Sequence, residues 1–518
     1  MTDYDNKNSN HVPDDKINDI QPLSDINDQG ESGGSGIKDD IKALMDLLYI
    51  KTVPSFGNNF FFTIGVYLLE IFVILAVTGM IMVVFGPYWW SSTAAGEFLR
   101  SIHLWAAEAF VTLLFVHFFV NLSTSAYKHK KLVWIIGSVM LMMALLEYAF
   151  GIGMSGDFIA QWNAIAGADL WNGLGLGFWV NPLNEGAVYG WHIAIVPILL
   201  ISLVAVHYMT VKRHGINKPY RKDIHYSMVP TDHKKMYRRM AYILVLILVF
   251  ATLLRAPYTP PLTIQSIAKN QPRTFAITLL NEFNFSSPTA TYLDTIDPYT
   301  YNMRLVYVTE PYEAYAAVQQ VNNSVTAFIY DNASVQDQYI AGAFAYFENN
   351  GSIVNATAST NPLVAVIGGL ITMADSGLYQ QALQEEAGNS LNQMYALRLM
   401  YDSGVMSQQA TQYGLQVEQW GMLKIAPNGW ELGYFLAPYN LLEILTNGIP
   451  WWNDIENGVI AGFVFIIILL LPYIPYLRDI PDKLGLYKIF WNRFTTPEIK
   501  RDKLELLERT KKELTDAL

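Results

Sequence analysis

Four histidines of the chain lie inside long apolar stretches, where a polar ring is unusual. His103 and His117 begin and end the stretch HLWAAEAFVTLLFVH, and His192 and His207 lie 15 residues apart in a later stretch. On a helix, separations of 14 and 15 residues return to within about 60° of the same face and place the two rings about 21 Å apart along the axis. Such histidines are typical of metal ligands, proton relays and hydrogen-bonded packing.

The elements that must hold these histidines are membrane spans. Hydrophobic residues make up 52% of the chain and charged residues 15%, which is typical of a membrane protein. A bilayer span needs roughly 20 apolar residues. Six segments qualify, at about 60–85, 103–125, 132–152, 190–211, 240–256 and 457–476.

The basic residues predict how the spans are oriented. Lys and Arg are frequent in the connections 126–131 and 212–239 and after Arg478, and such connections stay in the cytoplasm. The connections 86–102 and 153–189 are then exterior, and six spans leave both termini cytoplasmic. A net charge of −11 does not favour nucleic-acid binding.

In this topology the second and fourth spans run in the same direction. His103 therefore shares a depth with His192, and His117 shares a depth with His207. Two imidazoles that face each other at one depth form an axial haem site, and the second depth repeats it.

Glycines on the neighbouring spans repeat the same interval. Gly65 and Gly79 on the first span are 14 residues apart, as are Gly137 and Gly151 on the third. Small residues allow close helix packing, and the flat edge of a haem also needs a helix surface without side chains. Both interpretations are open at this point.

A long segment between the fifth and sixth spans is predicted to be exterior. Residues 257–429 contain only five Lys and Arg, and this composition indicates a compact inserted domain. The segment also contains five N-glycosylation sequons, which are acceptors only on an exterior face; they begin at Asn284, Asn322, Asn332, Asn350 and Asn355.

The four histidines and the two glycine pairs resemble the haem core of cytochrome b from the bc-type complexes. The resemblance covers about residues 40–256 and 427–477. The 15-residue histidine interval, Pro197 and the stretch HYMTVKRHGINKP are similar to the chloroplast-type branch. The insertion, with its few charges and several sequons, resembles homologues of thermoacidophilic archaea.

The resemblance implies two haems with the four histidines as metal ligands. The outer pair, His103 and His192, would hold the low-potential haem, and the inner pair would hold the high-potential haem. Arg100, three residues before the first ligand, would bind a haem propionate. Ala187 stands where the family has a second arginine, so the haems are expected to be b-type or an a-type variant.

The resemblance also implies a quinol site and a quinone site. Near the outer face, Glu431 is expected to accept a proton and Tyr439 to be the quinol-site tyrosine, although the family's Pro-Glu-Trp-Tyr motif is altered here. Asp157, expected to be a catalytic residue, is what remains of a second motif, after the third span. Lys212 takes the family's basic position near the inner quinone, or it anchors the span at the membrane surface. Glu147 has no counterpart in the family; a carboxylate at membrane depth either serves function or reaches the surface.

The expected function is that of a di-haem cytochrome b subunit in a quinol-oxidising respiratory complex. One electron would cross through both haems, and the other would pass to a Rieske iron–sulfur protein, which must be a separate subunit because this chain has no cysteine. The alternatives are a haem subunit of a quinol oxidase supercomplex that feeds a terminal oxidase, a histidine-relay transporter with a glycosylated exterior domain, and an exterior adhesion domain on a membrane anchor. Quinone and membrane lipid are the other expected partners, and nucleic acid is not.

The sequence thus predicts an all-α membrane protein, with a four-helix di-haem bundle, two further transmembrane helices and an inserted exterior soluble domain. The predicted parts, in order, are a disordered cytoplasmic tail (1–37), an amphipathic surface helix (38–56), the four-helix core (57–239), the fifth transmembrane helix (240–256), the glycosylated exterior insertion (257–426), the quinol-site segment with the sixth transmembrane helix (427–477) and a cytoplasmic tail (478–518).

Overall fold

The computed structural model describes residues 50–173, 177, 179–216, 227–256, 258–293, 301–319, 332–349, 353–388, 390–415 and 454–491, together with 507, 508, 510, 511 and 515. The chain divides into two compact units, Met1–Lys51 and Thr52–Leu518, and every element described below belongs to the second. The predicted tail 1–37, most of the predicted surface helix 38–56 and the segment 416–453 lie outside the described residues.

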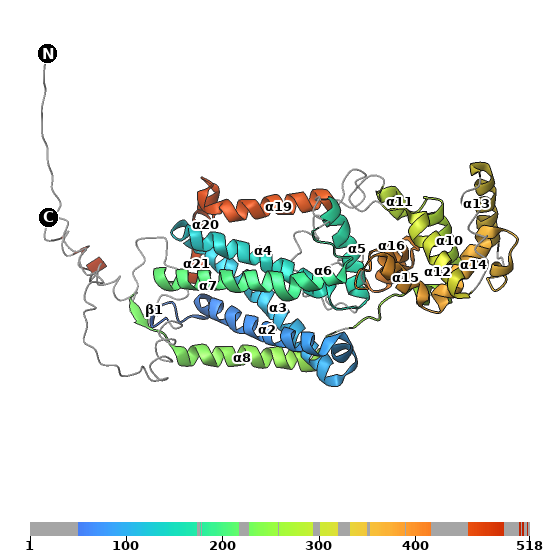
Figure 1. The fold of residues 1–518 in the computed structure, drawn as a ribbon. Coiled ribbons are helices and arrows are strands. Elements are labelled where there is room, and N and C mark those ends of the chain that lie inside the picture. Colours follow the sequence, from blue (N-terminus) through green and yellow to red (C-terminus); the bar gives the residue numbers. More distant parts are fainter. Residues whose placement is uncertain are drawn as a thin grey trace, which may run out of the picture. The chain divides into compact units, whose positions relative to one another are not determined.

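Within the described ranges, five helices are long and apolar enough to cross a membrane, and they run side by side in Figure 1. They are α2 (Phe60–Ser92), α3 (Ala94–Ser123), α4 (Lys131–Gly153), the continuous helix Glu185–His214 and α8 (His233–Leu253). The helix Glu185–His214 comprises α6 (Glu185–Gly190), the π-helical turn η2 (Trp191–Ile195) and α7 (Val196–His214). Two bent helix pairs raise the number of candidate spans to at most seven, and one of them includes the end of α19 (Asp454–Leu470), on the predicted sixth span. The predicted all-α membrane fold is confirmed.

The first span ends where the sequence predicts it. Gly86 has φ 78° and ψ 171°, which breaks the helix inside α2, and Pro87 starts a short further piece that ends at Ser92. Only glycine adopts this backbone without strain. The Thr93 hydroxyl then accepts a hydrogen bond from the Gly96 N–H at 3.1 Å and caps α3. The turn places α2 and α3 against each other as an antiparallel pair.

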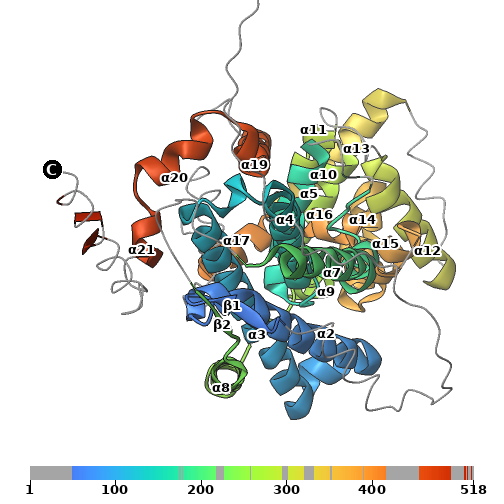
Figure 2. The same cartoon turned by 90° about the vertical axis from the view of Figure 1, so that its left-hand side faces the viewer.

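The basic connections meet at one end of the bundle, which we call the basic end. Strand β1 (Thr52–Pro54) pairs antiparallel with β2 (Met228–Pro230), so the starts of α2 and α8 lie together. Lys130 Nζ donates to the Ile216 carbonyl at 2.8 Å, which brings the α3–α4 connection beside the end of α7. Figure 2, turned so that this end faces the viewer, shows α8 beside α2 and α3.

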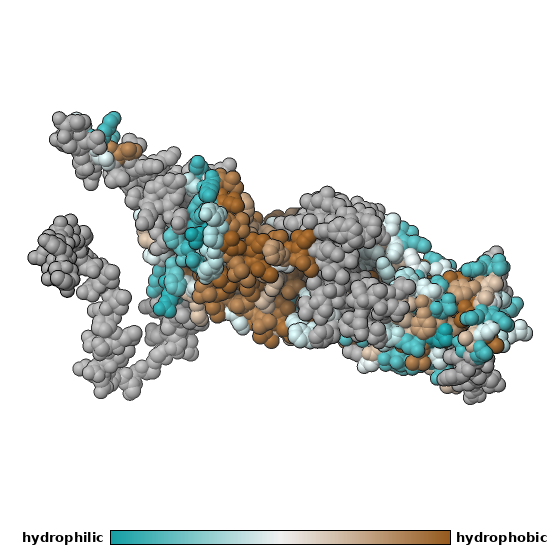
Figure 3. All heavy atoms as spheres, turned by 90° about the horizontal axis from the view of Figure 1, so that it is seen from above, coloured by the Kyte–Doolittle hydropathy of each residue, from teal (hydrophilic) through white to brown (hydrophobic). Residues whose placement is uncertain are grey.

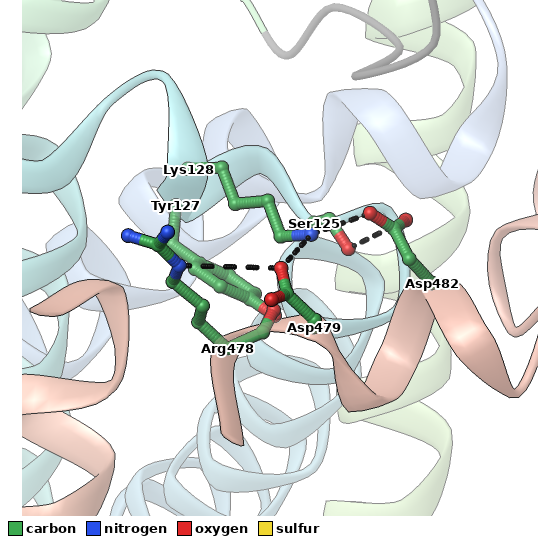
Figure 4. Close-up of polar contacts among 6 residues, drawn as sticks. All are labelled: Ser125, Tyr127, Lys128, Arg478, Asp479 and Asp482. Carbon is green, nitrogen blue, oxygen red and sulfur yellow. Dashed lines mark hydrogen bonds and ion pairs between the residues drawn. The ribbon is translucent and has the colours of Figure 1, made fainter. Parts of the chain in front are cut away.

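A charged cluster ties the segment after α19 to the same end. Lys128, in the short turn η1 (Ala126–Lys128), binds Asp479 at 2.8 Å and Asp482 at 2.5 Å. The Ser125 hydroxyl donates to Asp482 at 3.0 Å, and the Tyr127 hydroxyl donates to the Arg478 carbonyl at 2.7 Å (Figure 4). The Lys128 side chain is only 7% exposed, so its positive charge is paired with these two carboxylates where little water reaches it.

The outward faces of the long helices are apolar. Hydrophobic side chains cover the side of the bundle seen in Figure 3, and hydrophilic residues border them at the basic end. Exposed examples are Met80 and Val84 on α2, Ile198 and Met209 on α7 and Leu253 on α8. Large apolar side chains on the outside of a bundle indicate contact with lipid.

A second group of helices surrounds its own hydrophobic core. These are α5 (Phe158–Gly173), α9 (Ile264–Asn270), α10 (Pro272–Phe283), α11 (Pro288–Leu293), η3 (Arg304–Thr309), α12 (Glu310–Gln319), α13 (Ala333–Glu348), α14 (Pro362–Asp375), α15 (Leu378–Glu386), α16 (Met394–Asp402) and α17 (Val405–Gln412). Helix α14 is apolar on every side and largely buried by its neighbours, which accounts for its composition. Helix α5, from the connection after the third span, contributes Phe158 and Ile165 to this core, so the core is built from more than the predicted insertion 257–426.

Two carboxyl groups are paired inside this second core. Glu282 on α10 is fully buried, and its carboxyl lies within hydrogen-bond range of Asp402 at the end of α16. Burial raises the pKa of Glu282, and the neighbouring Asp402 raises it further. Burial also raises the pKa of Asp402, although the positive charge of Arg398 acts in the opposite direction. The pair therefore shares a proton where isolated carboxyls would have lost theirs.

Candidate functional site

His103 on α3 and His192 in η2 face each other across the bundle. Their ring centroids are 6.3 Å apart and the ring planes are inclined by 76°. A metal–imidazole bond is about 2 Å long, so two imidazoles on opposite sides of one metal ion have ring centres roughly 6 Å apart. The separation fits an iron ion held between the two rings.

His117 on α3 and His207 on α7 form a second pair, further along the same two helices. They are close enough to interact electrostatically. Among the described residues, no three His, Cys, Asp or Glu side chains are close enough to hold a metal ion by themselves. Each pair could supply two ligands to an iron ion, and the remaining ligands would then come from the ring of a haem.

Each predicted glycine lies against one of these histidines. A Cβ atom added at Gly79 would lie 3.4 Å from Cε1 of His103, and one at Gly151 would lie 3.0 Å from Cε1 of His192. The same test gives 3.8 Å between Gly65 and His117 and 3.5 Å between Gly137 and His207. The structure thus brings the eight predicted residues together as two sets of two histidines and two glycines.

Hydrogen bonds orient the rings of the first pair. Thr78 Oγ1 is 2.9 Å from Nδ1 of His103 and donates its own proton to the Ile74 carbonyl at 2.7 Å. It therefore accepts from the histidine. Nδ1 of His192 is 3.1 Å from the Glu147 carboxylate and 3.2 Å from the Glu147 carbonyl. Because Nδ1 is engaged in both residues, Nε2 of each ring remains for a metal ion.

A break in helical register positions His192. The N–H of Val196 donates to the carbonyl of Trp191, five residues back, instead of to the carbonyl four back. Pro197 follows at once and has no N–H to donate. Single π-helical turns of this kind are frequent at functional sites.

Arg100 and Asp157 lie at the end of the bundle opposite the basic end. Arg100, one helical turn before His103, donates to the Ala256 carbonyl at 2.9 Å and contacts the rings of Trp90 and Tyr258. The role of its guanidinium in binding a propionate stays a prediction.

Asp157 is 2% exposed and caps helix α5. Its carboxylate accepts from the Ser155 hydroxyl at 2.6 Å, from the Ala160 N–H at 3.0 Å and from the Thr259 N–H at 3.4 Å. These bonds give Asp157 a structural role, and the catalytic role expected from the sequence stays a prediction.

The remaining expected residues belong to the quinone sites. Lys212 is half-buried in the last turn of α7, five residues after His207, which suits either a quinone contact or an anchor. Glu431 and Tyr439 lie outside the described residues.

Sequence reasoning passed over one buried carboxyl of the bundle. Glu108 lies within the stretch that begins at His103, is 3% exposed and accepts a hydrogen bond of 2.5 Å from the Tyr148 hydroxyl. The rule that drew attention to Glu147, a carboxylate at membrane depth, applies equally to Glu108 and would have found it.

The fold and the site together define an all-helical membrane protein with two sets of opposed histidines. Residues 108–266 match the family described as cytochrome b (N-terminal)/b6/petB. These residues therefore form a cytochrome b domain, which confirms the resemblance to cytochrome b inferred from the sequence.

Three cytochrome b relatives agree with this assignment. Cytochrome b6 of Heliomicrobium gestii is 24% identical over 194 residues, which are 32% of this chain and 89% of that protein. Cytochrome b6 of Chlamydomonas reinhardtii is 25% identical over 204 residues, covering 35% of this chain and 94% of the relative. The cytochrome bc complex cytochrome b subunit of Chlorobaculum thiosulfatiphilum is 26% identical over 207 residues, which are 35% of this chain and 47% of that protein. A solved structure of a hyperthermophilic respiratory Complex III has 16% identity and a TM-score of 0.35, with coverage of 71% of this chain and 97% of that one.

Proposed function

We propose that this chain is the di-haem cytochrome b subunit of a bc-type, quinol-oxidising respiratory complex. The observation that carries the proposal is the opposed pair His103 and His192, whose ring centroids are 6.3 Å apart within a chain that contains a cytochrome b domain. The second pair, His117 and His207, would provide the second haem site. Bound haem supplies reversible one-electron chemistry, and b-type haem follows from the family.

The chain's own contribution is to hold two such sites at different depths. Fourteen residues of α3 separate His103 from His117, which corresponds to about 21 Å along the helix. The four histidines are partly buried between the spans, and burial is one of the factors that set a haem potential. An electron can then cross the membrane within one subunit.

The quinol reaction needs a partner. Oxidation of a quinol to a quinone releases two electrons and two protons. One electron would pass to a Rieske-type iron–sulfur subunit, because this chain has no cysteine to hold a cluster. The second electron would cross by the two histidine-held sites to a quinone near the basic end, beside Lys212. Glu431 and Tyr439 are the proposed quinol-site residues.

The orientation belongs to the same proposal, with the basic end and both termini in the cytoplasm. The helices that contain residues 258–415 would then be exterior and glycosylated. Of the five sequon asparagines, the three that the structure describes are all exposed, namely Asn284, Asn332 and Asn355.

Addition of a quinol to the purified complex tests the proposal. Absorbance at the haem bands should report reduction of two haems in the wild type, and His117→Ala should keep reduction of one haem only. Cyanide-sensitive oxygen consumption by the same preparation would indicate the alternative, a supercomplex with a terminal oxidase. A colourless preparation would contradict both and favour a histidine-relay transporter.

A further inference from the structure

Among the described residues, His192 has a carboxylate as a hydrogen-bond partner, and His103, the other histidine of the first pair, does not. Glu147 Oε1 lies 3.1 Å from Nδ1 of His192, and the Glu147 backbone carbonyl lies 3.2 Å from the same nitrogen. A neutral imidazole that binds iron through Nε2 keeps its proton on Nδ1. The carboxylate oxygen Oε1 and the backbone carbonyl oxygen of Glu147 are therefore both placed to accept a hydrogen bond from Nδ1–H of His192.

The other ligands have different surroundings. Nδ1 of His103 is bonded to the hydroxyl of Thr78, which carries no charge. Nδ1 of His207 is buried and has no hydrogen-bond partner among the described residues. Among the described residues, a carboxylate is thus bonded to a histidine ring at only one of the two proposed haem sites.

The position of Glu147 is determined by the helix that also carries Gly151. The two residues are four apart on α4, so they lie on the same face, and both contact the ring of His192. The side chains of Glu147 and His192 are 20% and 18% exposed. The second oxygen, Oε2, has no hydrogen-bond partner within the described ranges, so no second donor draws the carboxylate away from the histidine.

A carboxylate that accepts the Nδ1 proton makes an imidazole a stronger electron donor to its metal. The same arrangement orients histidine ligands and raises their basicity in zinc sites. With iron, a more basic ligand and a nearby negative charge stabilise the oxidised, more positive state. Hydrogen bonding around the axial ligand is one of the factors by which a protein sets a haem potential.

We propose that Glu147 is a positioning residue that lowers the reduction potential of the iron held by His103 and His192, relative to the iron held by His117 and His207. The proposal rests on the proposed function, because it requires a haem at each histidine pair. It gives a structural cause for electron flow from the first site to the second, because among the described residues only the donor end has a carboxylate bonded to a ligand histidine.

Redox titration of the purified complex, followed optically, tests this proposal in the variant Glu147→Gln, which keeps a hydrogen-bond acceptor and removes the charge. The ratio of reduced to oxidised haem at the first site should rise at least tenfold at a fixed ambient potential, which corresponds to about 59 mV for one electron. The second site should not change. Glu108→Gln, which removes another buried carboxyl of the bundle that bonds Tyr148 and no histidine, is the matched control and should leave both potentials unchanged.

An unchanged first-site potential in Glu147→Gln, or an equal shift at both sites, overturns the proposal. If that variant loses the first haem, Glu147→Asp decides, because it keeps the charge: a low potential supports the proposal and a raised one overturns it. A wild-type complex without two haems would instead contradict the proposed function itself, so the two failures are distinguishable.

Discussion

Substitution of Gly151 by alanine should weaken haem binding at one site only. The added Cβ would lie 3.0 Å from Cε1 of His192, whereas carbon atoms in favourable contact are about 3.5–4.0 Å apart. The ring must therefore move by about 0.5 Å. It cannot do so freely, because its Nδ1 is bonded to Glu147 and its backbone lies in the π-helical turn.

Extra methyl groups in well-packed interiors cost about 1–3 kcal/mol. Expressed as affinity, this is a decrease of about five- to 150-fold in haem binding at the first pair. The other glycines have more room beside their histidines, with 3.4 Å at Gly79, 3.5 Å at Gly137 and 3.8 Å at Gly65. The losses should follow the order Gly151, Gly79, Gly137, Gly65.

Haem content per chain, combined with the rate of haem transfer to an apoprotein acceptor, measures this order in the four glycine-to-alanine variants. Four equal losses would refute the reasoning from histidine contacts and would point to the edge of the haem itself. Lower thermal stability with full haem content would show that the glycines serve helix packing alone.

Three further changes test other parts of the structure. The raised pKa values of Glu282 and Asp402 mean that the folded state holds a proton that the unfolded state releases. The stability of this helical core should therefore be greatest near pH 4 and should fall as the pH rises, by at most about 1.4 kcal/mol per pH unit and proton. Thermal unfolding between pH 4 and pH 8 should show this slope and Glu282→Gln should flatten it, whereas a core that gains stability toward pH 8 would contradict the reasoning. Pro197→Ala restores an N–H that can close an ordinary helical turn, so the spectrum of the first haem should change while that of the second stays constant; an unchanged spectrum would show that proline does not maintain the π-helical turn. Lys128→Ala leaves Asp479 and Asp482 without their shared cation, so the complex should melt at a lower temperature with full haem content, whereas an unchanged melting temperature would mean that the cluster of Figure 4 contributes no stability.

The pattern of the bundle could be predicted from the sequence because membrane spans obey few rules. Apolar length located five long helices, and the first ends at Gly86 as expected. The 14- and 15-residue intervals, together with the predicted parallel direction of the second and fourth spans, also indicated which histidines would share a depth, and the structure places His103 opposite His192. Helical periodicity is sufficient for such statements because it fixes both the face and the height of a residue.

Contacts that depend on the rotation of one helix about its axis could not be predicted. Glu147 was visible as a carboxylate at membrane depth, but its contact with His192 requires the relative rotation of α4 and the turn η2. The same holds for Glu108 and Tyr148. The connection 153–189 was expected only to be exterior, and the packing of α5 into the second core depends on long-range contacts that leave no periodic signal.

The amount of haem bound per chain tests the central claim most directly. The pyridine haemochrome spectrum of the purified complex should give two haems for each copy of this chain. His192→Ala should give one, with the spectrum of the second site retained. A wild-type chain with one haem or none, or a His192→Ala variant that keeps two, would contradict the assignment of the histidine pairs.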